Sequence, residues 1–397
     1  MLTLTPSQAQ RFLLAQQFLW PPRSLQGKQG ILQLMQRLGC IQYDPVNIVG
    51  PNPHLVLQAR LQDYSPTLLN ELLYHDRLLW DGWDKVMSIY STTDWPYFAR
   101  RRAIMRQHYA QPDQAGMRLA DFVRQNLRQR GPLSSIDIQN QERADWFWGP
   151  TRLVRSTLEA LYFSGEIGIH HRIGTRRFFD RIENLLSAEL LQMPDPFPTL
   201  EAYHDWHVLR RIGSLGLAHP GAGEHWGGIL ECKSAQRQAA IKRLLQQGLI
   251  QAVQIIGLPQ HAFYLRNADL PLLEDLQPVE PCVSFLAPLD NLLWDRQRLR
   301  LLFNFDYIWE VYKPPAQRKY GHYTLPVLYG DQFVARFEPS LNRKTGRLTI
   351  QNWWWEADQQ HPSSPLQQAI AQALQAFAAY LQASSIELAP SISLPGL

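Results

Sequence analysis

Helical runs followed by alternating, hairpin-like stretches recur in the 397-residue chain, and this repeat constrains its fold most. Apolar residues at helical spacing from Thr151 to Tyr162 precede a stretch, Gly165–Phe179, that alternates and turns like a β-hairpin. A helical run at 235–247 precedes a second such stretch at 248–265. Short N-terminal helices with extended pieces between them fit the same pattern, which is typical of winged-helix domains. We therefore predict an α+β protein of tandem winged-helix units, each a helix-turn-helix plus a β-hairpin.

The C-terminal part of the chain is rich in strand-like stretches instead. Two of them, Tyr323–Phe337 and Arg347–Trp355, are followed by a helical run from Pro365 to Ala383 and then by a tail from Ser384. This order predicts a β-barrel-like subdomain with a closing helix. Because one core rarely keeps growing beyond about 250–300 residues, several domains are expected. We place them at 1–115, 116–195, 196–280 and 281–397.

Composition sets wide bounds on function. A hydrophobic content of 45% with 19% charged residues is that of an ordinary globular protein. The net charge is only +4, so a nucleic-acid partner has to be argued from where the basic residues lie. Three scattered cysteines exclude a disulfide framework or a zinc knuckle. No apolar run approaches the roughly 18 residues of a membrane span, so a cytoplasmic protein without a membrane partner is expected.

The stretch around Gln42 and Asp44 carries the strongest signal for chemistry. The two residues are two positions apart, and on an extended backbone alternate side chains share a face. Pro45 biases Asp44 toward extended geometry. Polar side chains embedded among apolar residues must be paired, or they are kept for chemistry. The alternative is a turn in which Asp44 and Asn47 bond to nearby backbone.

Arginines gather in two places. Arg100, Arg101 and Arg102 come shortly after the aromatic stretch that begins at Trp95, and such a cluster could track a phosphate backbone while an aromatic ring stacks on a base. The alternative is a solvated helix face whose arginine stems cover apolar surface. The expected wing of the second unit carries three more arginines at a position where winged-helix domains meet phosphates: Arg172, Arg176 and Arg177.

Two further groups were considered as metal sites. His204 and His207 are three residues apart on an expected helix, but no third ligand accompanies them. A nuclease would need clustered carboxylates, and the nearest pair, Asp290 and Asp295, is expected to be structural. We therefore predict no metal and no cofactor.

Two motifs resemble one known family. Gln42-Tyr43-Asp44 is similar to a Gln–apolar or aromatic–Asp catalytic motif, and a long second match runs from Phe285 through Asp290 to Arg296 and on to Gly330. Together they resemble the YcaQ-like branch of the bacterial interstrand-crosslink DNA glycosylases, relatives of AlkZ. The resemblance covers most of the chain. It implies tandem winged-helix units and a β-barrel around a basic concave channel.

The resemblance also implies an activity. Members of such a family hydrolyse the N-glycosidic bond of N7-alkylated purines and unhook nitrogen-mustard crosslinks. We expect a monofunctional DNA glycosylase, a monomer acting on double-stranded DNA with alkylated or crosslinked guanine in the bacterial cytoplasm, at the nucleoid. Asp44 would stabilise the sugar cation and activate water, and Gln42 would hold that water. Four further residues are expected to contact DNA: Asn47, His54, Trp83 and Lys85.

The chain differs from the family that it resembles at two places near the expected site. Gly50-Pro51-Asn52-Pro53-His54 stands where they carry an Arg-Ala-His-like segment, and Lys85 stands where a His is common. The lesion preference is therefore expected to differ. The competing interpretation is a non-enzymatic winged-helix DNA-binding protein or regulator.

Overall fold

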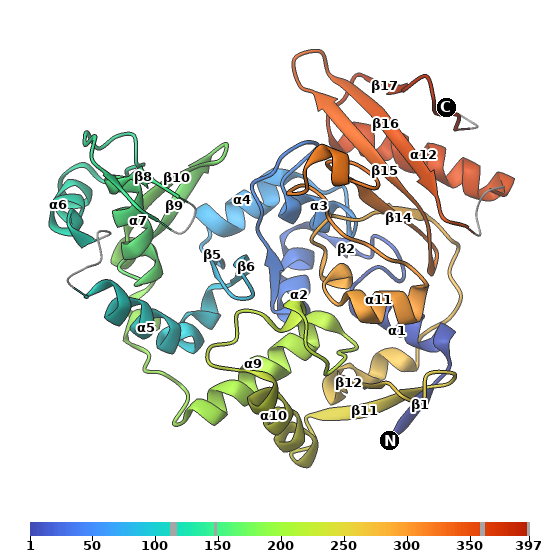
Figure 1. Ribbon diagram of the computed structural model, residues 1–397, viewed down its shortest axis with the longest axis horizontal. Helices are drawn as coiled ribbons and strands as arrows, with labels where there is room; N and C mark the ends of the chain where they lie inside the picture. The colour runs from blue at the N-terminus through green and yellow to red at the C-terminus, as the bar shows by residue number, and fades with distance from the viewer. Residues whose placement is uncertain (112–116, 147–148, 358–361, 395–397) are drawn as a thin grey trace. The chain divides into compact units, whose positions relative to one another are not determined.

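The computed structural model describes residues 1–111, 117–146, 149–357 and 362–394, and the chain forms two compact units (Figure 1). Unit 1 comprises Met1–Leu69, Gly82–Ile89 and His204–Leu397, and unit 2 comprises Asn70–Asp81 and Tyr90–Tyr203. Each unit is therefore assembled from separate stretches of sequence. The division into four consecutive domains remains a prediction.

Unit 1 holds most of the secondary structure. Its elements are β1 (Leu2–Leu4), α1 (Pro6–Gln16), β2 (Leu25–Gln26), α2 (Gly27–Leu38), β3 (Cys40–Gln42), α3 (Asn52–Gln58), β4 (Leu61–Gln62), α10 (Ser234–Gln246), β11 (Ile250–Ile255), β12 (Ala262–Arg266), β13 (Val283–Phe285), α11 (Arg296–Phe303), β14 (Leu325–Tyr329), β15 (Gln332–Asn342), β16 (Arg347–Trp355), α12 (Ser364–Tyr380) and β17 (Ser385–Leu388). The chain passes between the units inside four more elements: α4 (Pro66–Tyr74), β5 (Leu79–Trp83), β6 (Met87–Ser91) and α9 (Leu200–Leu215).

Local sequence explains where the first helices begin and end. Thr5 caps α1: its hydroxyl accepts the Gln8 N–H at 3.2 Å, and the Gln8 side chain accepts the Thr5 N–H at 2.9 Å. Pro6 takes the first helical position, where its missing N–H costs nothing. Helix α2 ends at Gly39, whose φ of 76° is a conformation that glycine adopts without strain. Both helix boundaries are therefore set by residues at the boundary itself.

The C-terminal region forms a five-stranded sheet of order β13-β14-β15-β16-β17 (Figure 1). In the described part of the chain β13 and β17 remain its two edges, so the sheet is a half-barrel rather than a closed barrel. Helix α12 packs on it through Phe377, whose ring centroid lies 5.4 Å from that of Phe285. Strand β17 was not expected. It pairs in parallel with β16, from Arg347 opposite Ser385 to Ile350 opposite Leu388, so the predicted tail is wrong there.

A second sheet joins the N-terminus to residues 250 positions away. Strand β1 pairs in parallel with β11, which pairs with β12 as an antiparallel hairpin. The main hydrophobic core of unit 1 lies beside this sheet and brings α1, α11 and the β-rich region together; its members include Phe12, Phe263, Leu299 and Phe333. None of the helices in the described ranges is long and apolar enough to span a membrane.

Unit 2 shows the expected order of helix, helix and hairpin. Its elements are a 3₁₀ turn (Thr92–Phe98), α5 (Ala99–Tyr109), α6 (Ala120–Arg130), β7 (Arg143–Ala144), β8 (Thr151–Arg152), α7 (Leu153–Phe163), β9 (Ile167–Ile173), β10 (Arg176–Arg181) and α8 (Ala188–Gln192). Strands β9 and β10 pair in antiparallel fashion, and Leu133 bridges to Phe179 beside them. The hairpin is confirmed. The winged-helix assignment remains a prediction.

Candidate active site

Gln42 and Asp44 lie at the end of β3, the edge strand of a three-stranded sheet of order β3-β6-β5. The Tyr43 N–H donates to the Met87 carbonyl at 2.9 Å and extends the pairing by one residue. Strand β3 ends at Gln42, and Asp44 lies two residues beyond it. The Gln42 side chain is buried and Asp44 is half-buried. No hydrogen bond joins these two side chains in the described structure.

One oxygen of the Asp44 carboxylate is committed to the backbone. Its Oδ1 accepts the Val46 N–H at 2.9 Å, which is the turn that the sequence left open as an alternative. This is the only hydrogen bond that the carboxylate makes within the described residues, so Oδ2 has no protein donor. Burial raises the pKa of Asp44, and the Val46 hydrogen bond partly opposes that shift. The site thus holds a carboxylate with one oxygen left for a ligand or water.

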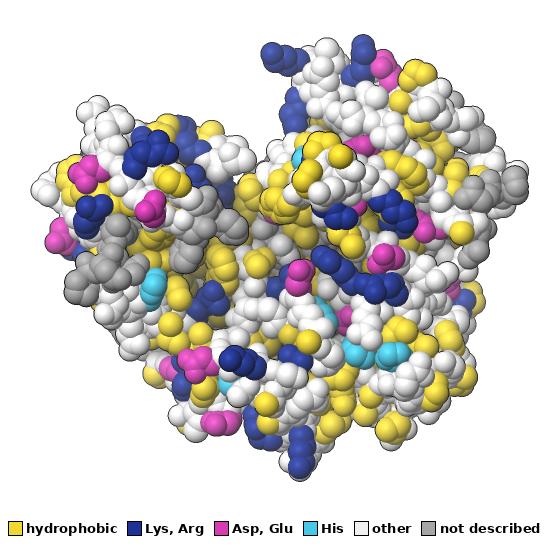
Figure 2. Space-filling model, in the orientation of Figure 1, with side chains coloured by type: hydrophobic (Ala, Val, Ile, Leu, Met, Phe, Trp, Pro, Cys, Tyr) yellow, Lys and Arg dark blue, Asp and Glu magenta, His cyan; other side chains and the backbone are white. Residues whose placement is uncertain are grey.

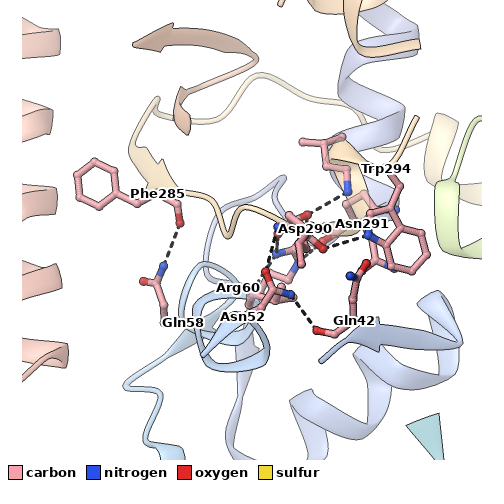
Figure 3. A network of polar contacts seen from close by, with 12 residues as sticks. Gln42, Asn52, Gln58, Arg60, Phe285, Asp290, Asn291 and Trp294 are labelled. Atoms are coloured by element: carbon pink, nitrogen blue, oxygen red, sulfur yellow. Dashed lines mark hydrogen bonds and ion pairs between the residues drawn. The ribbon is translucent and has the colours of Figure 1, made fainter. Parts of the chain in front are cut away.

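Two asparagines clamp the backbone of this segment (Figure 3). The buried Asn52 amide donates to the Gln42 carbonyl at 2.8 Å and accepts the Leu289 N–H at 3.0 Å. Asn291 donates to the Cys40 carbonyl at 2.9 Å. Both clamps tie β3 to the second family-like motif, so the two motifs that are far apart in sequence meet in space.

The motif around residue 290 is itself held by α3 and by the turn that follows this helix. Arg60 and Asp290 form a bidentate ion pair at 2.7 and 2.8 Å, and both side chains are completely buried (Figure 3). Gln58 donates to the Phe285 carbonyl at 2.9 Å. A paired and hydrogen-bonded ion pair of this kind fixes geometry, because breaking it would strand a charge in the interior.

Two tyrosines lie near enough to Asp44 for its charge to affect them. Burial raises the pKa of Tyr323 well above its usual value, and the Asp44 charge adds to the effect. The Tyr323 hydroxyl donates to the Gly50 carbonyl at 3.2 Å. Partial burial and then Asp44 also raise the pKa of Tyr312, although 82% of this residue is exposed. The charge of Asp44 therefore acts on one buried and one exposed tyrosine.

The two other polar residues predicted in this segment have protein partners. Asn47 is exposed, and its side-chain oxygen accepts a hydrogen bond from Arg343. His54 lies 2.7 Å from the Tyr64 hydroxyl through Nδ1, and burial lowers its pKa to about 4. His54 is therefore neutral at physiological pH. Their contacts with DNA remain predictions.

The turn between β5 and β6 is anchored by a buried charge network that the sequence analysis missed. Burial alone would raise the pKa of Asp84, but Arg210 and Arg211, at 2.8 and 2.7 Å, and His207, at 3.1 Å, hold it well below the usual value. A Cβ at Gly228 would collide with the Asp84 carbonyl oxygen, so the backbone packs closely there as well. The neighbouring residues of the turn are consequently fixed.

Lys85 projects from this anchored turn toward β3. Its Nζ lies 3.5 Å from the Gln42 side-chain oxygen and 5.2 Å from the centroid of the Trp294 ring. Burial, followed by the charge of Arg211, lowers the pKa of Lys85 to about 8. Trp83, on β5, is half-buried. The structure therefore brings Lys85 to Gln42, and whether either residue contacts DNA remains a prediction.

The arginines of α5 make contacts within unit 2. Arg100 pairs with Asp195 at 2.7 Å. The Arg102 guanidinium lies 3.7 Å above the Trp95 ring, and burial lowers its pKa to about 10. Arg101 is half-buried. Figure 2 shows Lys and Arg side chains, in dark blue, dispersed among acidic and apolar ones on this face of the molecule.

The hairpin arginines differ in what they contact. Arg172 forms an ion pair with the buried Asp81 at 2.7 Å, and Arg177 pairs with Glu159. Arg176 is exposed beside the turn, with its guanidinium 4.7 Å from the Phe178 ring centroid. Of the three, Arg176 is the one whose charge faces solvent, which makes it the hairpin arginine best placed to meet a phosphate.

The residues considered for metal binding have structural partners. His204 contacts the Leu230 carbonyl at 2.9 Å, and His207 contacts Asp84. Asp295 caps α11 by accepting the Arg298 N–H at 3.0 Å. No group of three possible metal ligands occurs among the residues that the structure describes.

Comparisons with known proteins show both a similar fold and a family. The structure is similar to that of the Streptomyces sahachiroi DNA glycosylase AlkZ, with a TM-score of 0.64 and 14% sequence identity over 98% of this chain and 100% of that chain. At this identity the likeness is one of fold. Residues 35–380 match the family model described as DNA glycosylase AlkZ-like. The chain belongs to the AlkZ-like DNA glycosylase family. This match confirms the family that the sequence motifs predicted, and it indicates a DNA glycosylase that acts in DNA repair.

Proposed function

We propose that the protein hydrolyses the N-glycosidic bond of N7-alkylated purines in double-stranded DNA and unhooks interstrand crosslinks through such bonds. Asp44 is the carboxylate that faces the sugar, and Gln42 is the amide that holds the attacking water. The observation that carries the proposal is the half-buried Asp44 carboxylate, which has one oxygen bonded to the Val46 N–H and the other without a donor among the residues that the structure describes.

Release of an N7-alkylated base requires few groups beyond the Asp44 carboxylate and the Gln42 amide. An N7-alkylated guanine already carries a positive charge, so it leaves without a proton from a general acid. The C1′–N9 bond breaks, its electron pair goes to the departing base, and a cationic sugar remains. A carboxylate beside C1′ stabilises that charge and can accept a proton from the incoming water, as carboxylates do in glycoside hydrolysis. Water is the nucleophile, so base release is monofunctional.

The environment of Asp44 suits it to both parts of this task. Burial favours the protonated form and so makes the ionised carboxylate a stronger base than an ordinary aspartate. The Val46 N–H donates to the ionised form and partly opposes that shift. The clamps of Asn52 and Asn291 hold the backbone that presents it.

The partial exposure of Asp44 supports an action on crosslinks. A guanine tethered to both strands cannot be turned fully into a closed pocket, in contrast to ordinary glycosylase substrates. A half-buried carboxylate whose charge acts on the 82% exposed Tyr312 suits a base that stays at the duplex, because an exposed ring can stack against the distorted bases.

The test is base release from three duplexes: unmodified, carrying a single N7-methylguanine, and crosslinked by a nitrogen mustard. Alkali converts each abasic site into a strand break, which a gel resolves. We expect breaks in the second and third duplexes only. Binding of alkylated duplex without any abasic sites would instead favour the non-enzymatic DNA-binding alternative.

A further inference from the structure

An open cavity lies in unit 1 at the end of the second family-like motif. Its volume is about 450 Å³, and its lining includes Trp294, Arg296 and Arg300 together with Glu224 from a separate part of the chain. We call it the Arg296–Arg300 cavity. A space of this size is in the range that protein ligand sites occupy, so the groups in its wall indicate what it can bind.

Two guanidinium groups form the cationic part of this wall. Arg296 and Arg300 are four residues apart on α11, so their side chains lie on one face of the helix. Arg296 pairs with Glu224 at 3.3 Å, and Arg300 pairs with Asp306 at 2.9 Å. All four side chains are exposed, and exposed ion pairs are weak. A phosphate can therefore replace either carboxylate at little cost.

The wall of the cavity is fixed to the backbone of the proposed catalytic segment (Figure 3). The Trp294 indole N–H donates to the Leu289 carbonyl at 3.0 Å. The Leu289 N–H donates to Asn52, which donates in turn to the Gln42 carbonyl. The Lys85 amine lies between the two parts, 3.5 Å from the Gln42 side-chain oxygen and 5.2 Å from the Trp294 ring centroid. A strand whose damaged nucleotide lies at Gln42 therefore has this cavity beside it.

The chemistry of the wall favours a phosphate over a base. A guanidinium presents its N–H donors as a planar fork that matches two phosphate oxygens. The aromatic residue of the wall, Trp294, is only 7% exposed and has its N–H committed to Leu289, so it offers little surface on which a base could stack. In protein–DNA complexes, contacts with phosphates fix the position of the protein on the duplex.

We propose that the Arg296–Arg300 cavity binds a backbone phosphodiester of the damaged strand within two nucleotides of the lesion. The placement rests on the proposed function, because it takes Gln42 as the position of the damaged nucleotide. The proposal goes beyond that function because the two arginines contact no reacting atom. They hold the strand in register, so that the C1′ atom of the damaged nucleotide meets Asp44.

Duplex binding tests the proposal without base release. The probe is a fluorescent duplex with one tetrahydrofuran residue, a stable analogue of an abasic site. In a series of the same duplex, one phosphate at a time is replaced by a neutral methylphosphonate. Fluorescence anisotropy gives the Kd of each duplex at several salt concentrations. For the wild type, we expect one replacement within two nucleotides of the analogue to weaken binding about tenfold, the effect of one charge-assisted contact.

The variant Arg296→Gln with Arg300→Gln should weaken binding of the unmodified-backbone duplex by a similar factor. It should also lower the salt dependence by about one unit of slope and lose its sensitivity to that one methylphosphonate. Its melting temperature should match that of the wild type, because the arginines and their partners are exposed. The control, Lys233→Gln with Lys242→Gln, removes two exposed cations of unit 1 and should keep the sensitivity.

A double arginine variant that binds like the wild type, loses no more affinity than the control, or keeps the wild-type sensitivity to every methylphosphonate would overturn the proposal. A sensitive phosphate farther than two nucleotides from the analogue would overturn the placement beside Gln42.

Free phosphate is the other source of the same chemical group. If inorganic phosphate raises the melting temperature of the wild type but not of the arginine variant, while both bind the duplex equally, the cavity holds the free ion and the proposal is overturned. Because the probe has no base to release at the analogue, phosphate binding can be found when base release fails, and the reverse. The two proposals therefore fail independently.

Discussion

At the scale of the single residue, the charge of Asp44 works against the stability of the fold. Its pKa is raised by burial, so the folded state favours the protonated form more than the unfolded chain does. The free energy of unfolding is therefore unaffected below the unfolded pKa. It falls as the pH rises through the interval between the unfolded and folded values, and the full penalty is present above the folded value. A group kept at a cost to stability is typical of a functional site.

Asp44→Asn should consequently stabilise the protein at neutral pH while it slows the proposed chemistry. We expect the melting temperature at pH 7.5 to rise by about 1–2 °C, the change that a fraction of a kcal/mol produces in a chain of this size. The asparagine oxygen can still accept the Val46 N–H. At pH 3.5 the difference should vanish, because Asp44 is then protonated in the folded protein. A lower melting temperature at pH 7.5 would contradict the assignment of a raised pKa.

Arg176 and Arg172 should behave differently although both lie on the same hairpin. Arg176 is exposed, so Arg176→Ala should leave stability unchanged and lower the salt dependence of duplex binding by about one unit of slope, the share of one phosphate contact. Arg172→Ala strands the buried Asp81 and should destabilise unit 2 by about 3–5 kcal/mol. Fluorescence anisotropy at several salt concentrations and denaturant unfolding separate the two effects. An unchanged slope with Arg176→Ala would remove it from the DNA contacts.

At the scale of the elements, the site depends on the lock between β3, α3 and the segment around Asp290. Asn52, Asn291 and the Arg60–Asp290 pair connect these parts through side-chain bonds rather than through one sheet. This arrangement explains in physical terms why the two motifs behave as one unit: neither segment can move without leaving buried polar groups unpaired. The lock positions the backbone of Gln42 and therefore the start of the catalytic segment.

Removing one partner of the Arg60–Asp290 pair should lower the free energy of unfolding strongly, whereas replacing both partners with apolar side chains should not. Asp290→Ala leaves Arg60 as a buried, unpaired charge, and we expect a loss of about 3–5 kcal/mol in the free energy of unfolding. The double variant Arg60→Met with Asp290→Leu should recover most of it. Denaturant unfolding measures both. The control is Glu387→Ala, which removes the exposed pair with Arg347 and should cost no more than about 1 kcal/mol. A loss with Asp290→Ala no larger than the control would show that the pair does not hold the site.

Helix boundaries could be predicted from local sequence, whereas elements that depend on a distant partner could not. Thr5 and Gly39 mark the ends of helices through their own backbone and side chain, so their roles can be inferred without tertiary structure. That Gln42 and Asp44 share a face stays a prediction, because β3 ends at Gln42 and Asp44 lies beyond the described strand. Strand β17 was missed because its partner β16 supplies the pairing that a short, polar stretch cannot specify by itself.

At the scale of the whole molecule, the site is built by hydrogen bonds between residues far apart in the sequence, which no local sequence pattern predicts. Asp84 meets His207 across 123 positions, and Asn291 meets Cys40 across 251. The family resemblance found Gln42 and Asp44, but it said nothing of the network that fixes the turn carrying Lys85. A signal was present: an aspartate in an aromatic, glycine-broken stretch must be paired if it is buried. Its partners could be identified only in the folded chain.

The same burial makes the molecule sensitive to acid. Burial lowers the pKa of His54, His207 and His225 to about 4 each. These residues contribute stability that is fully present above the unfolded pKa of about 6.5 and is lost as the pH falls toward 4, because the unfolded chain binds protons that the folded protein excludes.

We therefore expect the melting temperature to fall steeply between pH 6.5 and 4. His54→Gln should flatten this dependence, whereas His75→Gln, at a side chain that is 86% exposed, should leave it unchanged. Differential scanning fluorimetry across this range is sufficient. A melting temperature that stays constant down to pH 4 would contradict the burial of these histidines as neutral groups.

The most direct test of the central claim is the single-turnover rate of base release from a duplex with one N7-methylguanine, measured for the wild type, Asp44→Asn and the matched control Asp275→Asn. Asp275 is an exposed carboxylate of unit 1. We predict that Asp44→Asn binds the duplex as tightly as the wild type and releases the base about 10²–10⁴-fold more slowly, the range for loss of a positioned acid or base. Asp275→Asn should match the wild type. Base release by Asp44→Asn at the wild-type rate would contradict the assignment.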